Sequence, residues 1–160
     1  GLDAAASTVR ISKKKLFSLY GKMVREFPFH YLEDPFGEND FASFRALCEI
    51  SGSEMHIAGD DLTVTNAKRM KRAHNEKSVN AMIVKPNQIG TVSEALDAVK
   101  LARKFGWAVV ASHRSGETND DFIADFSYGV YAHGLKLGAP CRGERIAKYN
   151  RLLEIDSRET

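Results

Sequence analysis

Residues 81–86 read AMIVKP. Four apolar residues are followed at once by Lys85 and Pro86. A short, continuous apolar run bounded in this way is typical of a parallel strand that is buried on both faces of a sheet. Because proline biases the preceding residue toward an extended backbone, Lys85 is predicted to lie at the end of this strand.

The same pattern recurs along the chain. Four further apolar runs of strand length end abruptly in polar residues, at 29–32, 55–58, 107–111 and 129–135. Most lack a clean alternation of polar and apolar residues and contain Val, Ile or aromatic residues, as strands buried on both faces do. The sequence therefore predicts a series of parallel strands.

Segments with helical periodicity lie between these runs, and helices are predicted over 12–27, 91–105 and 145–155. In the first segment, Leu16, Leu19 and Tyr20 fall on one apolar stripe. Thr91 and Glu94 have the spacing of a capping box. The order strand, loop, helix therefore repeats, which predicts parallel strand pairing.

Polar residues at the strand ends recur at a nearly constant interval. Glu33 and Asp60 are 27 residues apart, and Asp60 and Lys85 are 25 apart. His113 follows Lys85 by 28 residues, and Lys136 follows His113 by 23. This is the period of βα units. In a (β/α)₈ barrel the carboxyl ends of all strands meet on the face that holds the active site.

Six strand ends, from Asp3 to Lys136, predict an α/β fold that forms part of a TIM-type (β/α)₈ barrel, two strands short of closure. The 160 residues are 43% hydrophobic, and no linker-like stretch divides them, so residues 1–160 are predicted to be one barrel region. Because the sequence starts at Gly1 inside a strand end, without an initiator Met, we expect the chain to be incomplete.

Composition argues against several classes of partner. The net charge is +2, from 23 basic and 21 acidic residues spread along the chain, which does not resemble a surface for nucleic acid or an anionic membrane. The basic run 68–72 follows Asn66 and is predicted to be a solvated helix face. No apolar run approaches the ~20 residues of a membrane span, and no signal peptide is recognisable. We expect a cytoplasmic protein.

Asp3, Glu33 and Asp60 are predicted to form a metal site, because they stand at neighbouring strand ends. Carboxylate oxygens are the ligands that Mg²⁺ prefers. The alternative is that strand-end acids cap the following helix or pair with a lysine, an assignment that suits Asp34 and Asp61 better.

Lys85 is a candidate catalytic base. Burial, a nearby Mg²⁺ and a second cation at Lys136 would each favour the neutral amine that a base requires. The alternative is a lysine that extends into solvent at the rim of the barrel.

His113, Arg114 and Ser115 place an imidazole, a guanidinium and a hydroxyl in one short loop, residues 112–117. The planar guanidinium matches phosphate geometry, which predicts an anion pocket. The alternative is a structural His-Arg pair. The remaining histidines have no such neighbours and are expected to be structural: His30, His56, His74 and His133.

Six segments resemble enolases, in the order in which enolases carry them. They are GLDAAAS at 1–7, LEDPF at 32–36, GDDLTVTN at 59–66, KPNQIGT at 85–91, SHRSGET at 112–118 and RIAKYN at 145–150. Together they span nearly the whole chain. The resemblance implies the C-terminal catalytic barrel of a lyase of glycolysis and gluconeogenesis, which converts 2-phosphoglycerate to phosphoenolpyruvate with Mg²⁺.

The resemblance also implies a role for each strand-end residue. The carboxylates of Asp3, Glu33 and Asp60 would bind Mg²⁺. Lys85 would take the α-proton of 2-phosphoglycerate.

The remaining roles implied by the resemblance concern substrate contacts. Arg114 and Ser115 would hold the phosphate, and His113 and Lys136 would contact the substrate, with Lys136 beside its carboxylate.

Other features of enolases fall outside this sequence. Enolases have an N-terminal domain and earlier barrel segments, and these supply acids that assist hydroxide departure; the complete protein is implied to be a homodimer. The segment between Asp3 and Glu33 is shorter than enolases usually have. The chain alone is therefore expected to be inactive. The alternatives are a non-catalytic enolase-like binding or assembly subunit and another acid–base enzyme of the superfamily.

Overall fold

Six short strands pair side by side, all parallel and in sequence order, to form one sheet in the computed structural model, which describes residues 1–28, 30–51 and 55–159. The strands are β1 Leu2–Asp3, β2 Tyr31–Glu33, β3 His56–Gly59, β4 Ala81–Val84, β5 Ala108–Ser112 and β6 Gly134–Lys136. Within the described residues, β1 and β6 each pair with a single neighbour. The predicted partial (β/α)₈ barrel is confirmed.

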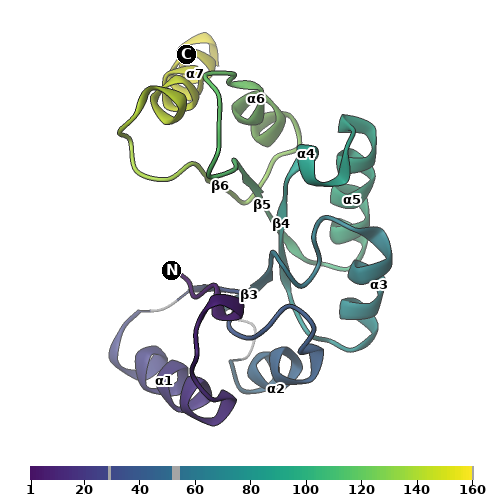
Figure 1. The fold of residues 1–160 in the computed structure, drawn as a ribbon. Helices are drawn as coiled ribbons and strands as arrows, with labels where there is room; N and C mark the ends of the chain where they lie inside the picture. The colour runs from purple at the N-terminus through teal and green to yellow at the C-terminus, as the bar shows by residue number, and fades with distance from the viewer. Residues whose placement is uncertain (29, 52–54, 160) are drawn as a thin grey trace.

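Helices follow the strands and cover the outer side of the sheet. They are α1 Lys13–Glu26, α2 Phe41–Ser51, α3 Ala67–Asn75, α4 Pro86–Ile89, α5 Val92–Lys104, α6 Phe122–Gly129 and α7 Gly143–Glu159, with a short 3₁₀ turn η1 at Ala6–Thr8. Figure 1 shows the elements following an open arc, with the strands on its concave side and the helices outside. None of the helices described is both long and apolar enough to cross a membrane.

Alternate residues of the strands enter two separate apolar clusters. Ala58, Ala81 and Ala108 occupy directly paired positions on β3, β4 and β5 and form a small cluster with Tyr31. Their chain neighbours belong instead to the main core: Ile57, Met82 and Val109. Because side chains alternate between the faces of a strand, the alanines mark the concave face and the main core lies beneath the helices.

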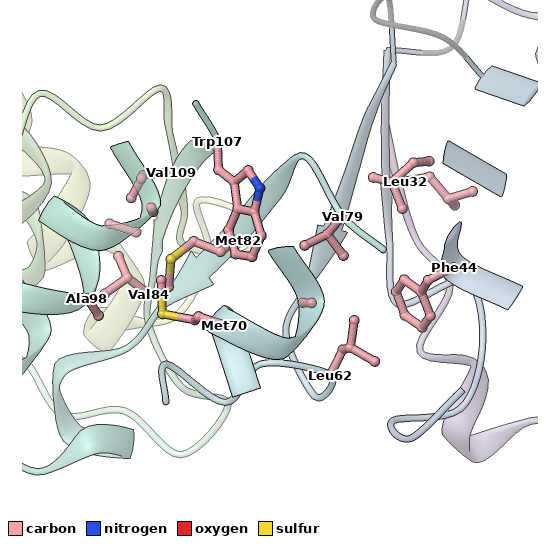
Figure 2. Close-up of a cluster of buried hydrophobic side chains, with 14 of the residues drawn as sticks. Leu32, Phe44, Leu62, Met70, Val79, Met82, Val84, Ala98, Trp107 and Val109 are labelled. Atoms are coloured by element: carbon pink, nitrogen blue, oxygen red, sulfur yellow. The ribbon is translucent and has the colours of Figure 1, made fainter. Parts of the chain in front are cut away.

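The main core joins the sheet to the surrounding helices. Met82 and Val84 of β4 pack with Met70 of α3 and with Trp107, as Figure 2 shows, and Phe44 of α2 lies further along the same layer. Met70, Met82 and Phe44 have no exposed surface. Burial of this continuous apolar layer fixes each helix against the strands.

The predicted strand at 129–135 is wrong over its first five residues. α6 continues to Gly129, and β6 begins only at Gly134. His133 is fixed by backbone contacts: its Nδ1 accepts the Val109 N–H at 3.1 Å. The strand predicted at 29–32 starts at Tyr31 in the structure, and Phe29 lies outside the described residues.

The predicted helix starts are confirmed at two caps. The Thr91 hydroxyl accepts the Glu94 N–H at 3.2 Å, and Asn66 Oδ1 accepts the Lys68 N–H at 3.0 Å. Lys68 and Lys71 are exposed on α3, as expected for a solvated face, but Met70 is buried and Arg69 Nε donates to the Leu62 carbonyl at 2.6 Å, so residues 68–72 are only partly solvated. Leu19, predicted to be on the buried stripe of α1, is 45% exposed.

Asn80 extends the pairing of β3 and β4, and its loss should destabilise the sheet. Its Oδ1 accepts the Ile57 N–H at 2.7 Å, and its Nδ2 donates to the Met55 carbonyl at 2.9 Å. We expect Asn80→Ala to lower the free energy of unfolding by about 1–3 kcal/mol, since two backbone groups lose their partner. Urea denaturation of the full-length protein measures this change. The exposed Asn75→Ala is the control, and equal losses in both variants would contradict the prediction.

Candidate active site at the carboxyl ends of the strands

The predicted acids and lysines lie along one rim of the sheet. Asp3, Glu33 and Lys136 end β1, β2 and β6, while Asp60 and Lys85 directly follow β3 and β4. Asp3 and Glu33 are paired in the register of β1 and β2, so their side chains project from neighbouring positions of the two strands. Ion pairs gather these five residues into two groups.

The first group joins the last strand to the first two. Lys136 Nζ lies 2.7 Å from Asp3 Oδ2 and 2.7 Å from Glu33 Oε1. Tyr31 donates its hydroxyl to Glu33 Oε2 at 2.8 Å, so both oxygens of this carboxylate are used. The same residues border a cavity of about 350 Å³ that opens between β1, β2 and β6.

Burial and charge act against each other in this group. Burial raises the pKa of Glu33, whose side chain is 1% exposed, although the bonds from Lys136 and Tyr31 partly offset that effect. Burial acts to lower the pKa of Lys136, but its bonds with Asp3 and Glu33 outweigh burial and raise the pKa. Lys136 is therefore held as a cation between the two acids.

The second group consists of Lys85 and Asp60. Lys85 Nζ forms an ion pair with Asp60 Oδ2, and the side chains are only 12% and 11% exposed. The Lys85 backbone is extended, as predicted before Pro86, and its N–H donates to Thr65 Oγ1 at 3.1 Å. The lysine is thus buried on the concave side, which contradicts the alternative of a solvent-extended side chain.

Asp34 supports the strand end that carries Asp60. Its Oδ1 accepts the Asp60 N–H at 3.0 Å, and its Oδ2 accepts the Asp61 N–H at 2.8 Å. Burial raises the pKa of Asp34 to about 7, although these N–H donors favour the carboxylate. The assignment of Asp34 to a helix cap or a lysine pair is therefore wrong: it fixes the backbone of the next strand end.

The arrangement of acids differs in one respect from the predicted set. Among the described residues, the three acids whose oxygens all come within 4.8 Å of one another are Asp34, Asp60 and Asp61. Both oxygens of Asp34 accept backbone N–H bonds, and Asp60 Oδ2 pairs with Lys85.

The donor set fits a hard divalent cation. Asp60 Oδ1 is buried and has no hydrogen-bond partner, which is unusual for a buried carboxylate oxygen. Asp3 and Glu33 already share one cation, the Lys136 ammonium. Asp3, Glu33 and Asp60 each pair with a lysine here, as the alternative expected, and each also has the carboxylate oxygens that Mg²⁺ prefers.

The loop after β5 contains His113, Arg114 and Ser115, the residues predicted to form an anion pocket. The Arg114 N–H donates to Glu117 Oε1 at 2.9 Å, and Arg114 Nη1 lies 3.4 Å from Asn87 Oδ1. Ser115 is exposed. The His113 Nδ1 is buried without a partner, while its backbone N–H donates to the Lys136 carbonyl at 3.1 Å. The loop is thereby joined to the end of β6.

Comparison with known proteins agrees with this geometry. A family model described as "Enolase, C-terminal TIM barrel domain" matches residues 2–159. The chain belongs to the enolase family. It is 46% identical to Enolase of Aeropyrum pernix over 98% of this chain and 39% of that protein. It is 50% identical to Enolase 2 of Hevea brasiliensis over 92% of this chain and 33% of that protein. The chain thus spans well under half the length of these enolases.

Three residues that support this enolase-family site were not predicted from the sequence: Tyr31, Asp34 and Lys148. Tyr31 precedes Glu33 by two residues, and that period-2 spacing could have identified it. Asp34 binds a strand 26 residues away, and Lys148 of α7 binds Glu117 in the 112–118 loop. No local pattern signals such contacts, because they depend on the packing of distant segments.

The support from Asp34 can be tested by Asp34→Asn. The amide can accept only one of the two N–H bonds, and its NH₂ group faces the other donor. We expect the free energy of unfolding to fall by about 1–3 kcal/mol. Urea denaturation of the full-length protein, with Asp61→Asn at the less buried neighbour as control, measures the difference. Equal stability of Asp34→Asn and wild type would contradict this role.

Proposed function

We propose that the protein containing this chain is a Mg²⁺-dependent lyase that converts 2-phosphoglycerate to phosphoenolpyruvate and water. The observation that carries this proposal is the convergence of Lys85, Lys136 and three strand-end carboxylates on the concave rim of an enolase-family barrel. A lysine base beside a carboxylate-bound metal is the arrangement that proton abstraction next to a substrate carboxylate requires.

Lys85 serves as the base in this proposal. It lies on the concave face with Asp60 as its ionic partner. Asp3, Glu33 and Asp60 would hold Mg²⁺, which when bound would supply positive charge next to the anion that forms as the α-proton leaves. As the base, Lys85 accepts the α-proton from carbon through its Nζ.

The other residues hold the substrate in place for this step. Arg114 and Ser115 bind the phosphate, because a guanidinium and a hydroxyl are good donors to its oxygens. Lys136 contacts the substrate carboxylate, and His113 contacts the substrate from the neighbouring loop. After the proton leaves, the carbon–carbon double bond forms as hydroxide departs from the adjacent carbon and is protonated to water.

Residues 1–160 form the C-terminal catalytic barrel region in this proposal. The groups that assist hydroxide departure are assigned to other parts of the protein, because the chain covers 39% of the Aeropyrum pernix relative. A place in glycolysis, a cytoplasmic location and a homodimer belong to the same proposal and follow from the resemblance to enolases.

Lys85→Ala tests the base directly. In the full-length protein we expect exchange of the substrate's α-proton with solvent to be abolished, because no other group takes that proton. Mg²⁺ binding should stay close to wild type. Proton NMR of 2-phosphoglycerate in D₂O measures the exchange. Exchange at the wild-type rate would remove Lys85 from this role, and a wild-type protein without exchange or turnover would favour the non-catalytic alternative.

Asp60→Asn tests the metal ligand. The substitution removes one formal negative charge from the carboxylates, so Mg²⁺ affinity should fall tenfold or more, about 1.4 kcal/mol. Isothermal titration calorimetry measures the affinity without reference to activity. Asp97→Asn, at an exposed carboxylate of α5 outside the site, serves as the control. Unchanged affinity in Asp60→Asn would show that Asp60 does not bind the ion.

A further inference from the structure

Lys148 is a fully buried lysine that the proposed reaction does not use. It lies on α7, and its side chain is 0% exposed. Its Nζ donates to the Thr118 carbonyl at 2.9 Å and to the Glu144 carbonyl at 2.7 Å, and it lies 3.0 Å from Glu117 Oε2. All three donor positions of the ammonium are therefore filled. Burial of a lysine is costly unless it is paired, so this side chain is held by a specific set of acceptors.

Glu117 connects Lys148 to the anion-pocket loop. Its Oε2 pairs with Lys148, and its Oε1 accepts the Arg114 N–H at 2.9 Å. Burial acts to raise the pKa of Glu117, but the Arg114 N–H and Lys148 outweigh burial and lower it. The loop is thus fixed at two points: at Arg114 through the carboxylate, and at Thr118 by Lys148 directly.

We propose that Lys148 is a positioning residue that holds the 112–118 loop, and with it Arg114 and His113, in the conformation that binds the substrate phosphate. This inference rests on the proposed function for the identity of the substrate. The contacts themselves are independent of it, since they hold the loop to α7 whatever anion the loop binds.

A general role in docking α7 belongs to a different residue. Arg151, one turn further along α7, forms ion pairs with Asp125 of α6 at 2.6 Å and with Glu154 at 2.9 Å. α6 and α7 pack closely against each other. Lys148, by contrast, makes two of its three contacts with the loop. Arg151 is therefore a matched control: a cation on the same helix that does not touch the loop.

The ring of His113 reports on this network. Burial lowers the pKa of His113; Glu117 in the same loop opposes this, while Arg145 and Lys148 of α7 and Lys136 of β6 lower it further. Removal of the Lys148 charge should raise this pKa, and removal of the Glu117 charge should lower it. Opposite shifts of the His113 pKa in the two variants are informative. Loss of structure would instead raise the His113 pKa toward the ordinary histidine value in both.

The experiment compares Lys148→Met, Lys148→Arg, Glu117→Gln and Arg151→Met in the full-length protein. The first readout is the KM for 2-phosphoglycerate. The second is the titration of His113 followed by NMR of histidine-labelled protein. We expect Lys148→Met to raise KM tenfold or more, with a smaller change in kcat, and to shift the His113 pKa upward. Lys148→Arg should recover part of both effects, and Arg151→Met should change neither.

Two outcomes would overturn the proposal. One is Lys148→Met with a lower unfolding temperature but with wild-type KM and His113 titration, since Lys148 would then only stabilise the fold. The other is Glu117→Gln with wild-type KM and an unmoved His113 titration, a result that decides the matter if Lys148→Met does not fold. Absence of turnover in wild type would contradict the proposed reaction instead, and the His113 titrations would still test the positioning role.

Discussion

All six strands pair in parallel and in sequence order, and this pairing determines where every residue of the candidate site lies. It places the carboxyl end of every strand on one rim, so residues that are about 25 positions apart in sequence become neighbours in space. Period-2 alternation then decides which of them face inward. Ala81 and Lys85 are four residues apart, so an alanine lies in the concave apolar cluster and a lysine stands at the rim above it. A shift of one residue in the strand register would turn all of these inward-facing side chains toward the helices.

Because the acids meet at one rim, their negative charges are balanced by lysines at the same rim. The rim concentrates acids in a partly buried space, where an unpaired carboxylate is costly. The chain supplies two lysines, and each pairs with acids from other strands: Lys136 with Asp3 and Glu33, and Lys85 with Asp60. The lysines proposed to act on the substrate therefore also neutralise the acids proposed to bind the metal. A divalent cation bound at this rim would add to the positive charge that the two lysines already bring to these acids.

The role of a residue can be predicted from the sequence when it depends on the residue's own strand, but not when it depends on a contact with a distant segment. The run 81–84 and the strand-end positions were predicted correctly, because burial on both faces leaves a continuous apolar signature. Residues 129–133 were misassigned, because the apolar end of α6 runs directly into the approach to β6 and composition cannot separate them. Asp34 and Lys148 act through contacts with residues 26 and 30 positions away in the sequence, and no local sequence pattern predicts such contacts.

The two ion-pair groups also differ in the length of chain that separates their members. Lys85 and Asp60 are 25 residues apart, within one βαβ unit, so their pair depends on the pairing of β3 and β4. Lys136 and Asp3 are 133 residues apart, and their pair closes a loop that contains the entire sheet. Such closure carries a larger entropic cost and depends on every intervening strand pair being formed. The rim around Lys136 is therefore the part of the site most sensitive to any loosening of the sheet, while the Lys85 pair depends mainly on its own two strands.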